Sequence, residues 1–186
     1  MSAGFLVING SPRANGRSSR IERLLLSRLH CDYPGEVVDV FRASDTPVRG
    51  CVGCDYCEQA STCVMDDEMA GIIGKLLSAR AVFVVSPIYF SGVPSQMKAV
   101  RDRLQPLFFR RMRKLEEGQG VPPKRPLVLY LVGEGGDPHG YEPAVTECKS
   151  AFNLADLSLT LGRAFIGADQ PRVPDDLPIP DLDVRA

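Results

Sequence analysis

Four cysteines crowd the segment CVGCDYCEQASTC, residues 51–63, and clustered thiols are suited to metal binding or redox chemistry. Their spacing, C-x2-C-x2-C-x5-C, is formed by Cys51, Cys54, Cys57 and Cys63. A compact C-x2-C-x2-C run allows three thiolates to bind one face of an iron–sulfur cubane while the fourth closes the site. Structural zinc usually takes ligands from two separated pairs, so the run favours iron. It is not a bacterial ferredoxin motif, because valine rather than proline follows the last cysteine.

A second candidate site is the loop GSPRANGRSS, residues 10–19, which follows a short apolar run and leads into a helical pattern. Glycines let a backbone approach a ligand closely, and the free N–H groups at a helix N-terminus attract anions. The loop is not a P-loop, since no Gly-Lys-Ser/Thr follows, and the dinucleotide motif G-x-G-x-x-G is absent. It therefore predicts a cradle for a phosphate monoester. The candidate donors are Ser11, Arg13, Asn15, Ser18 and Ser19.

The segment SPIYFSGVPSQMKAVRDR, residues 86–103, follows another apolar run and offers a surface for a planar ring. Pro87 stiffens it, Gly92 permits a tight turn, and Tyr89 and Phe90 supply flat apolar faces. An isoalloxazine ring requires such a face together with backbone amides along its polar edge. Ligands of open α/β sheets bind at the carboxyl ends of parallel strands, so this segment and the first loop are expected to form one site.

The two motifs, GSPRxxGxSS and SPIYFxGxPSQMKAxxDR, together resemble the NADPH-dependent FMN reductase family of the flavodoxin-like fold. The match is good over residues 5–103, and beyond them it consists of a strand followed by the glycine turn at 133–136. The resemblance implies that the first loop holds the FMN phosphate and that the later loops contact the ring and ribityl chain. The implied phosphate residues are Ser11, Arg13, Ser18 and Ser19. The implied ring-side residues are Pro87, Ile88, Tyr89, Phe90, Gly92, Gly133, Gly135 and Gly136.

The cysteine loop, residues 51–63, is similar to that of the iron–sulfur flavoproteins, a branch of the same family. The resemblance implies a [4Fe-4S] cluster bound by Cys51, Cys54, Cys57 and Cys63. It also implies a homodimer or homotetramer in which clusters and flavins of neighbouring subunits exchange electrons. Relatives that keep such cysteines without a cluster leave a second interpretation open, in which the loop is a structural cap. The remaining two cysteines, Cys31 and Cys148, are expected to be small buried side chains.

Alternating apolar strands and amphipathic helices predict an α/β fold with a doubly wound, parallel, five-stranded sheet that is flavodoxin-like. The expected strands are residues 5–9, 37–41, 81–85, 127–132 and 159–166. Helices are expected from 18 to the Pro-Gly at 34–35, after the acidic residues 66–68, over 95–104 and over 141–154. We expect one FMN-binding domain, residues 1–170, and a Pro-rich C-terminal tail, residues 171–186. The tail is expected to be extended, and either loose or laid across a partner subunit.

Length and charge exclude several classes of partner. The chain has 186 residues, 44% of them hydrophobic, and a formal net charge of -1, so no basic field indicates nucleic acid or an anionic membrane. Apolar runs are the length of strands, and the N-terminal residues lack the layout of a secretory signal. We therefore expect a cytoplasmic protein, whose cysteines meet a reducing environment. The basic residues within 110–114 are interpreted as a solvated face or a subunit contact.

The expected function is that of an FMN-dependent electron-transfer flavoprotein with a cluster on the cysteine loop. Its partners would be small-molecule or protein electron donors and acceptors, with NAD(P)H as one candidate. No catalytic side chain is expected, because the cofactor carries the chemistry. One alternative is a cluster-free NAD(P)H-dependent FMN or quinone reductase. Another is a non-enzymatic module whose thiols bind metal or sense redox state.

Overall fold

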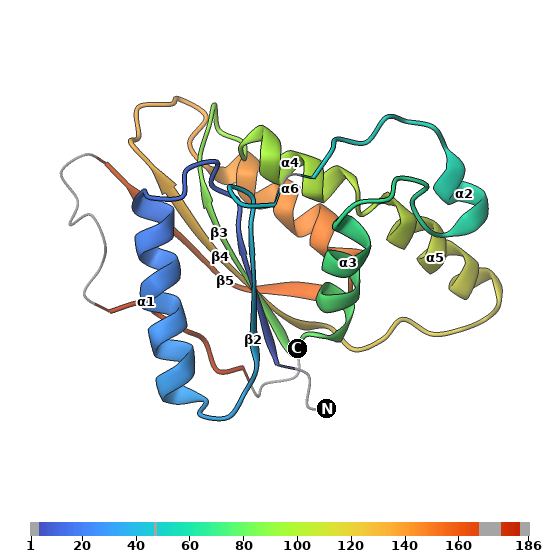
Figure 1. Ribbon diagram of the computed structural model, residues 1–186, viewed down its shortest axis with the longest axis horizontal. Helices are drawn as coiled ribbons and strands as arrows, with labels where there is room; N and C mark the ends of the chain where they lie inside the picture. Colours follow the sequence, from blue (N-terminus) through green and yellow to red (C-terminus); the bar gives the residue numbers. More distant parts are fainter. Residues whose placement is uncertain (1–3, 47, 168–175, 183–186) are drawn as a thin grey trace.

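The computed structural model describes residues 4–46, 48–167 and 176–182. Its centre is a five-stranded sheet of order β2-β1-β3-β4-β5, in which every neighbouring pair of strands is parallel (Figure 1). The elements along the chain are β1 (Phe5–Asn9), α1 (Arg17–Asp32), β2 (Val38–Arg42), α2 (Tyr56–Ala60), α3 (Met69–Ser78), β3 (Ala81–Pro87), α4 (Ser95–Asp102), α5 (Gln105–Glu116), β4 (Arg125–Gly133), α6 (Glu142–Asn153) and β5 (Leu157–Ile166). The doubly wound, flavodoxin-like sheet predicted from the alternation is confirmed.

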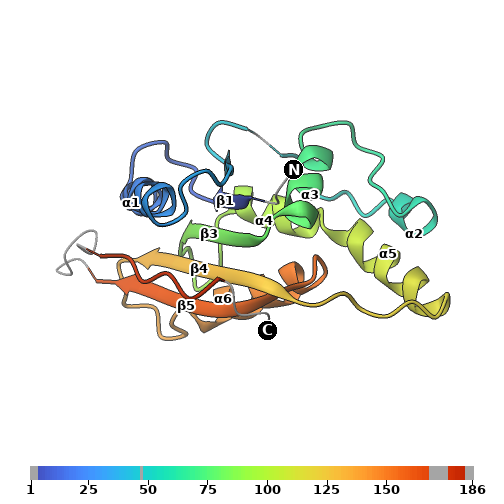
Figure 2. The ribbon, with the colours of Figure 1, turned by 90° about the horizontal axis from the view of Figure 1, so that it is seen from below.

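The central strands are buried on both faces, which explains their continuous apolar sequences. In β1 the side chains alternate: Phe5 and Val7 pack with α1, whereas Leu6 and Ile8 pack under α3 and α4. Helix α1 lies on one side of the strands and α3, α4 and α6 lie on the other (Figure 1), and Figure 2 shows β1 between α1 and α3. Among the described residues, no helix is long and apolar enough to cross a lipid bilayer.

The face that α1 leaves open is covered by residues 176–182 of the chain's own C-terminal segment (Figure 1). Leu177 and Leu182 are buried in the same apolar cluster as α1, and the Tyr130 hydroxyl donates a hydrogen bond to the Pro178 carbonyl at 2.6 Å. The expectation of a tail that is loose or laid across a partner is therefore wrong for these residues. A single helix does not cover five strands, so apolar side chains further along the chain complete the core.

The rest of the predicted tail, residues 171–175 and 183–186, lies outside the described residues. The division into a domain of residues 1–170 and a tail of residues 171–186 thus remains a prediction. The structure shows only that residues 176–182 of the predicted tail pack into the core of the predicted domain.

Two helices were not anticipated. The cysteine loop contains the short helix α2, and the helix expected over 95–104 ends at Asp102, after which α5 begins. Pro106 in the first turn of α5 is compatible with a helix start, because its missing N–H has no helical acceptor there. Cys148 is buried as expected, whereas Cys31 at the end of α1 is exposed.

Candidate functional site

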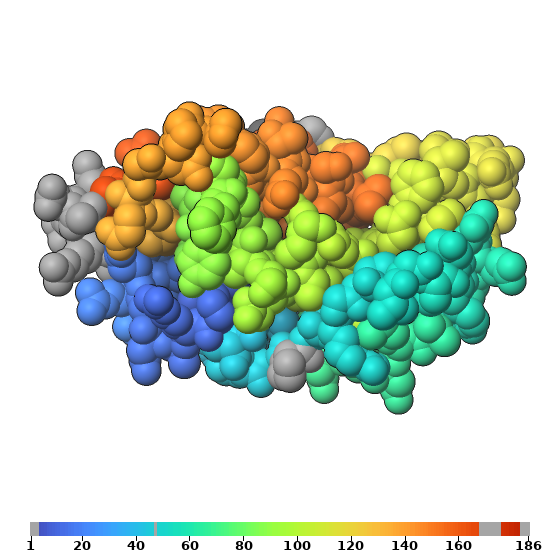
Figure 3. Space-filling model, turned by 90° about the horizontal axis from the view of Figure 1, so that it is seen from above, coloured from blue at the N-terminus to red at the C-terminus, as the bar shows by residue number. Residues whose placement is uncertain are grey.

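The loops that follow β1, β3 and β4 lie side by side at the carboxyl edge of the sheet (Figure 3). Between them is a pocket of about 660 Å³. Seven predicted cofactor residues line it: Ser11, Arg13, Ser18, Pro87, Ile88, Tyr89 and Gly133. The structure thus brings the first and third strand ends to one pocket, as the order of the sheet requires.

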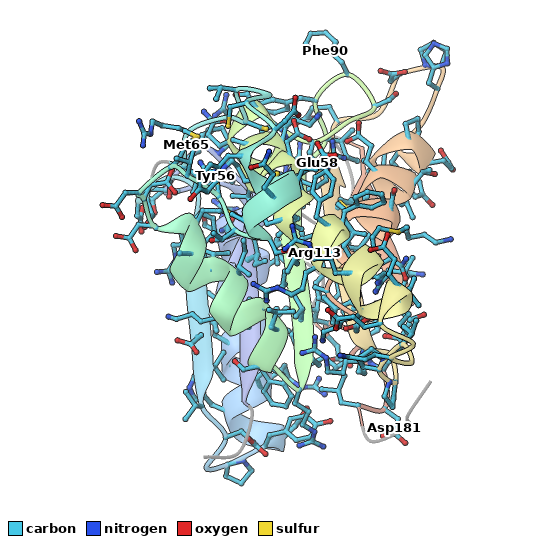
Figure 4. All side chains as sticks on the ribbon, turned by 90° about the vertical axis from the view of Figure 1, so that its right-hand side faces the viewer. Tyr56, Glu58, Met65, Phe90, Arg113 and Asp181 are labelled. Carbon is cyan, nitrogen blue, oxygen red and sulfur yellow. The ribbon has the colours of Figure 1, made fainter. Side chains whose placement is uncertain are left out.

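Six other predicted residues are not part of the pocket wall: Asn15, Ser19, Phe90, Gly92, Gly135 and Gly136. The clearest case is Phe90, which is fully exposed and projects from the top of the molecule (Figure 4). Phe90 and Ser91 both have left-handed backbone, with φ of 50° and 61°. This turn, closed by paired backbone hydrogen bonds of 3.0 Å between Tyr89 and Gly92, directs the Phe90 ring away from the pocket.

The loop after β1 presents the N-terminus of α1 to the pocket. Gly16 precedes the helix in extended backbone, and no side chain caps the first turn, which also lacks acidic residues. The first N–H groups of the helix are therefore available to an anion. Ser11 fixes the loop, since its hydroxyl accepts a hydrogen bond from the Arg13 N–H at 3.1 Å. Gly10 allows close packing on α4, because a Cβ there would lie 2.8 Å from the Cβ of Met97.

The buried carboxylate of Glu22 is linked to the loop after β1 through the side chain of Asn9. Glu22, only 2% exposed, accepts hydrogen bonds from the Asn9 amide at 2.6 Å and from Arg42 at 2.7 Å. The Asn9 side-chain oxygen in turn accepts the Ser11 N–H at 3.0 Å. The position of the loop backbone therefore depends on a chain of contacts from Glu22 to Ser11.

Sequence reasoning missed five residues of the pocket wall: Gly16, Arg17, Arg20, Val132 and Glu134. Arg17 joins the two sides of the pocket, because it pairs with Glu134 and donates to the carbonyls of Gly133 and Gly167. Together with Arg13 and Arg20 it gives the pocket wall three cations against one carboxylate, that of Glu134. Two of these arginines could have been identified from the sequence, because Arg17 and Arg20 stand directly before and after the Ser-Ser pair of the first motif.

All four cysteines of the cysteine loop line a second pocket, of about 420 Å³. Burial raises the pKa of the Cys57 thiol, and the charges of the three other thiols add to the rise because they are nearby. The side chains are nevertheless not gathered at one point. Among the described residues, no group of three or more His, Cys, Asp or Glu side chains is arranged to hold a metal ion.

Arg103 joins the two ends of the cysteine loop. Its guanidinium donates two parallel hydrogen bonds of 2.9 Å to Asp67 and a third, of 3.0 Å, to the carbonyl of Arg49. The hydrogen bonds from Arg103 hold the pKa of Asp67 below its usual value. The flanks of the loop are therefore fixed by protein contacts alone.

The basic residues of α5 hold the middle of the same loop. Arg113 donates to the carbonyls of Glu58 and Gln59 at the end of α2, and Arg110 donates to that of Ser61 at 3.5 Å. Figure 4 shows Arg113 beside the part of the loop that carries Glu58. The interpretation of this stretch as a solvated face or subunit contact is corrected: two of its arginines complete the C-terminus of α2.

The class of protein follows from this fold, this pocket and one comparison. The family of NADPH-dependent FMN reductases matches residues 4–165 of the chain. The chain belongs to this family.

Within the family, the chain belongs to the iron–sulfur flavoprotein branch. It is 31% identical over 160 residues to an iron–sulfur flavoprotein of Archaeoglobus fulgidus, an alignment that covers 86% of this chain and 68% of that protein. A second alignment, to an iron–sulfur flavoprotein of Methanocaldococcus jannaschii, has 31% identity over 100 residues, or 54% of this chain and 51% of the relative. The chain thus spans about half the length of this relative.

Solved structures support the fold. An azoreductase from Bacillus anthracis has a TM-score of 0.65 at 15% identity, covering 89% of this chain and 87% of the other. The Trp repressor binding protein from Bacillus subtilis has a TM-score of 0.54 at 16% identity, covering 91% and 88%. At these identities the similarity concerns the arrangement of strands and helices.

Proposed function

We propose that the chain is an electron-transfer flavoprotein that binds FMN in the pocket at the carboxyl edge of the sheet and an iron–sulfur cluster on the cysteine loop. The observation that carries the first part is the convergence of Ser11, Ser18 and Tyr89 on one pocket wall, from the ends of β1 and β3. Three arginines at one end match a phosphate monoester, which carries between one and two negative charges at neutral pH.

The division of the pocket into a charged end and an apolar end orients the cofactor. Arg13 and the uncapped N-terminus of α1 would hold the phosphate, while Pro87, Ile88 and Tyr89 would lie along the ring. Bound FMN accepts hydride or single electrons at its ring, so the chain needs to supply binding, orientation and tuning rather than an acid or base. We propose NAD(P)H as one electron donor.

For the cluster, the donor set fits. Four thiols line one pocket, and cysteine thiolates are the ligands that iron–sulfur clusters take. When bound, a cluster supplies one-electron transfer beside a cofactor that also accepts electron pairs. The loop that carries Cys51, Cys54, Cys57 and Cys63 is already held by arginines, so binding requires rearrangement within the loop rather than folding of a new segment.

A cluster-free NAD(P)H-dependent FMN or quinone reductase is the second candidate. It is favoured by the absence of a preassembled metal group among the described side chains. For either function we propose a homodimer or homotetramer, in which a second copy would cover the fully exposed Phe90, the neighbour of the pocket residue Tyr89. Light scattering during size-exclusion chromatography measures this assembly.

Titration of the apoprotein with FMN and with riboflavin tests the flavin site. Riboflavin lacks the phosphate, so FMN is expected to bind more tightly. Arg13→Gln is expected to weaken FMN binding by about 10–100-fold, the value of a charge-assisted hydrogen bond, and to leave riboflavin binding unchanged. Arg23→Gln is the matched control, since Arg23 is an arginine of α1 outside the pocket wall. Equal affinity for both flavins would refute the phosphate assignment.

Anaerobic purification followed by iron, sulfide and flavin analysis separates the two candidates. About four irons and four sulfides per chain, with a broad absorption shoulder beside the flavin bands, are expected for the electron-transfer function. Flavin without iron after anaerobic reconstitution would favour the cluster-free reductase.

A further inference from the structure

Arg103 is the largest of the fully buried side chains, at 1% exposure, and it lines the pocket of the four cysteines. It follows directly after α4, an eight-residue helix about 12 Å long at 1.5 Å per residue. The other end of α4 meets the loop that contributes Tyr89 to the flavin pocket. One short helix therefore connects the flavin loop to the cysteine pocket, and Arg103 stands at the cysteine end.

The hydrogen bonds of Arg103 leave its Nε–H unused. Nη1 donates to Asp67 and to the Arg49 carbonyl, and Nη2 donates to the other carboxylate oxygen of Asp67. The Nε–H, however, is buried and has no hydrogen-bond partner among the described atoms. A buried donor without a partner is rare in native structures, and one explanation is a group that is bound there in the active protein.

The charge of Cys63 acts on this guanidinium. The hydrogen bonds to Asp67 are the main reason that the pKa of Arg103 is raised, and the charge of Cys63 adds to the rise. Both side chains belong to the wall of the same pocket. A permanent cation, a buried donor without a partner and four thiols thus belong to one pocket.

We propose that Arg103 is a positioning residue of the metal centre: it holds the ends of the cysteine loop together and presents its positive charge and its unpartnered Nε–H to the pocket that the four cysteines line. The inference rests on the proposed cluster. Reduction of such a centre adds one electron and no proton, so a nearby cation stabilises the reduced form and raises the reduction potential. Asp67 offsets part of this charge, and the effect is accordingly smaller than for an isolated cation.

A purely structural arginine would behave differently. It would be required for the shape of the loop, but its charge would leave the potential of the centre unchanged. Lysine keeps the charge and loses the two-pronged contact with Asp67, whereas glutamine loses both. Comparing Arg103→Lys with Arg103→Gln therefore separates charge from shape.

The experiment uses the anaerobically reconstituted full chain, with and without the substitutions. Because Arg103→Gln leaves Asp67 without its cation, the double variant Asp67→Asn/Arg103→Gln is measured beside it. Lys98→Gln is the control, since Lys98 is an exposed cation on α4 whose partner is Asp102. The readouts are iron and sulfide per chain, the midpoint potential of the centre from a redox titration monitored by electron paramagnetic resonance, and the flavin potential in the same sample.

Loss of the charge is expected to lower the ratio of reduced to oxidised centre at fixed potential about tenfold, a shift of about 59 mV to more negative potential. Arg103→Lys is expected to lie closer to the unsubstituted chain, and Lys98→Gln and the flavin potential are expected not to move. Loss of iron from the glutamine variants alone, with FMN still bound, would also support the inference. Unchanged iron content and potential in every variant would overturn it. Absence of iron from the unsubstituted chain would instead overturn the proposed cluster, and the inference with it.

Discussion

The Arg103–Asp67 pair provides the sharpest test of how the cysteine loop is held. Asp67→Asn removes the charge of a carboxylate whose side chain is only 12% exposed and leaves a guanidinium that is 1% exposed without its counter-ion. Removing one partner of a buried ion pair costs about 3–5 kcal/mol of unfolding free energy. Asparagine keeps one oxygen for the Met69 N–H, which Asp67 accepts at 3.2 Å. We therefore expect a loss of about 3 kcal/mol, at the lower end of that range.

Urea unfolding of the protein without FMN measures this loss, because a bound ligand would add its own stabilisation. For a slope of about 2 kcal/mol per molar, the midpoint should fall by about 1.5 M. Asp102→Asn is the control: it breaks an exposed pair with Lys98 on α4, which is worth about 0.5 kcal/mol. If Asp67→Asn lost no more than this control, the pair would not be what holds the loop.

The same carboxylate predicts a pH dependence. Its pKa is lowered in the folded chain, mainly by the hydrogen bonds from Arg103. Its stabilisation is therefore complete above the unfolded value of about 3.9 and is lost as the pH falls through the lower folded value. Unfolding curves between pH 5 and pH 2 should decline less steeply for Asp67→Asn than for the unsubstituted chain. Parallel curves would contradict this assignment.

Three further changes test other parts of the structure. Leu177→Ala should cost about 2–5 kcal/mol in urea unfolding, because this fully buried side chain of the C-terminal segment would leave a cavity. Glu22→Gln should cost about 2 kcal/mol and weaken FMN binding in a fluorescence titration, because Asn9 and Arg42 donate to different oxygens of Glu22 and glutamine would turn an NH2 donor toward one of them. Burial raises the pKa of Cys148 to about 12, so mass spectrometry should find it unmodified by iodoacetamide at pH 8 while the exposed Cys31 reacts.

The two substitutions have matched controls, and Cys31 is the internal control for Cys148. Asp176→Asn changes an exposed neighbour of Leu177 and should alter the unfolding free energy by no more than about 0.5 kcal/mol. Glu116→Gln, at the exposed end of α5, should leave FMN binding unchanged. Alkylation of Cys148 at the rate of Cys31 in the folded protein would show that its helix opens far more readily than its burial indicates.

The sequence alone determined the sheet and the general place of the pocket at its carboxyl edge. Strands such as β1 and β3 are short apolar runs and α1 has a helical period, and these local patterns are enough to give an alternating α/β order. Parallel pairing then brings the ends of β1 and β3 to one edge, so Ser11 and Tyr89 meet without further information.

The tertiary structure decided what local spacing does not encode. The partners of Arg103 and Arg113 lie 36 to 55 positions away along the chain, so the sequence shows a basic stretch but not that it binds the cysteine loop. Phe90 is an aromatic residue of the kind that contacts a flavin ring, yet the left-handed backbone at Phe90 and Ser91 directs its side chain outward. Leu177 lies in a Pro-rich segment and is buried because α1 alone leaves part of the sheet uncovered. In each case the side chain's role depends on which distant backbone or surface it meets, and only the folded chain fixes that.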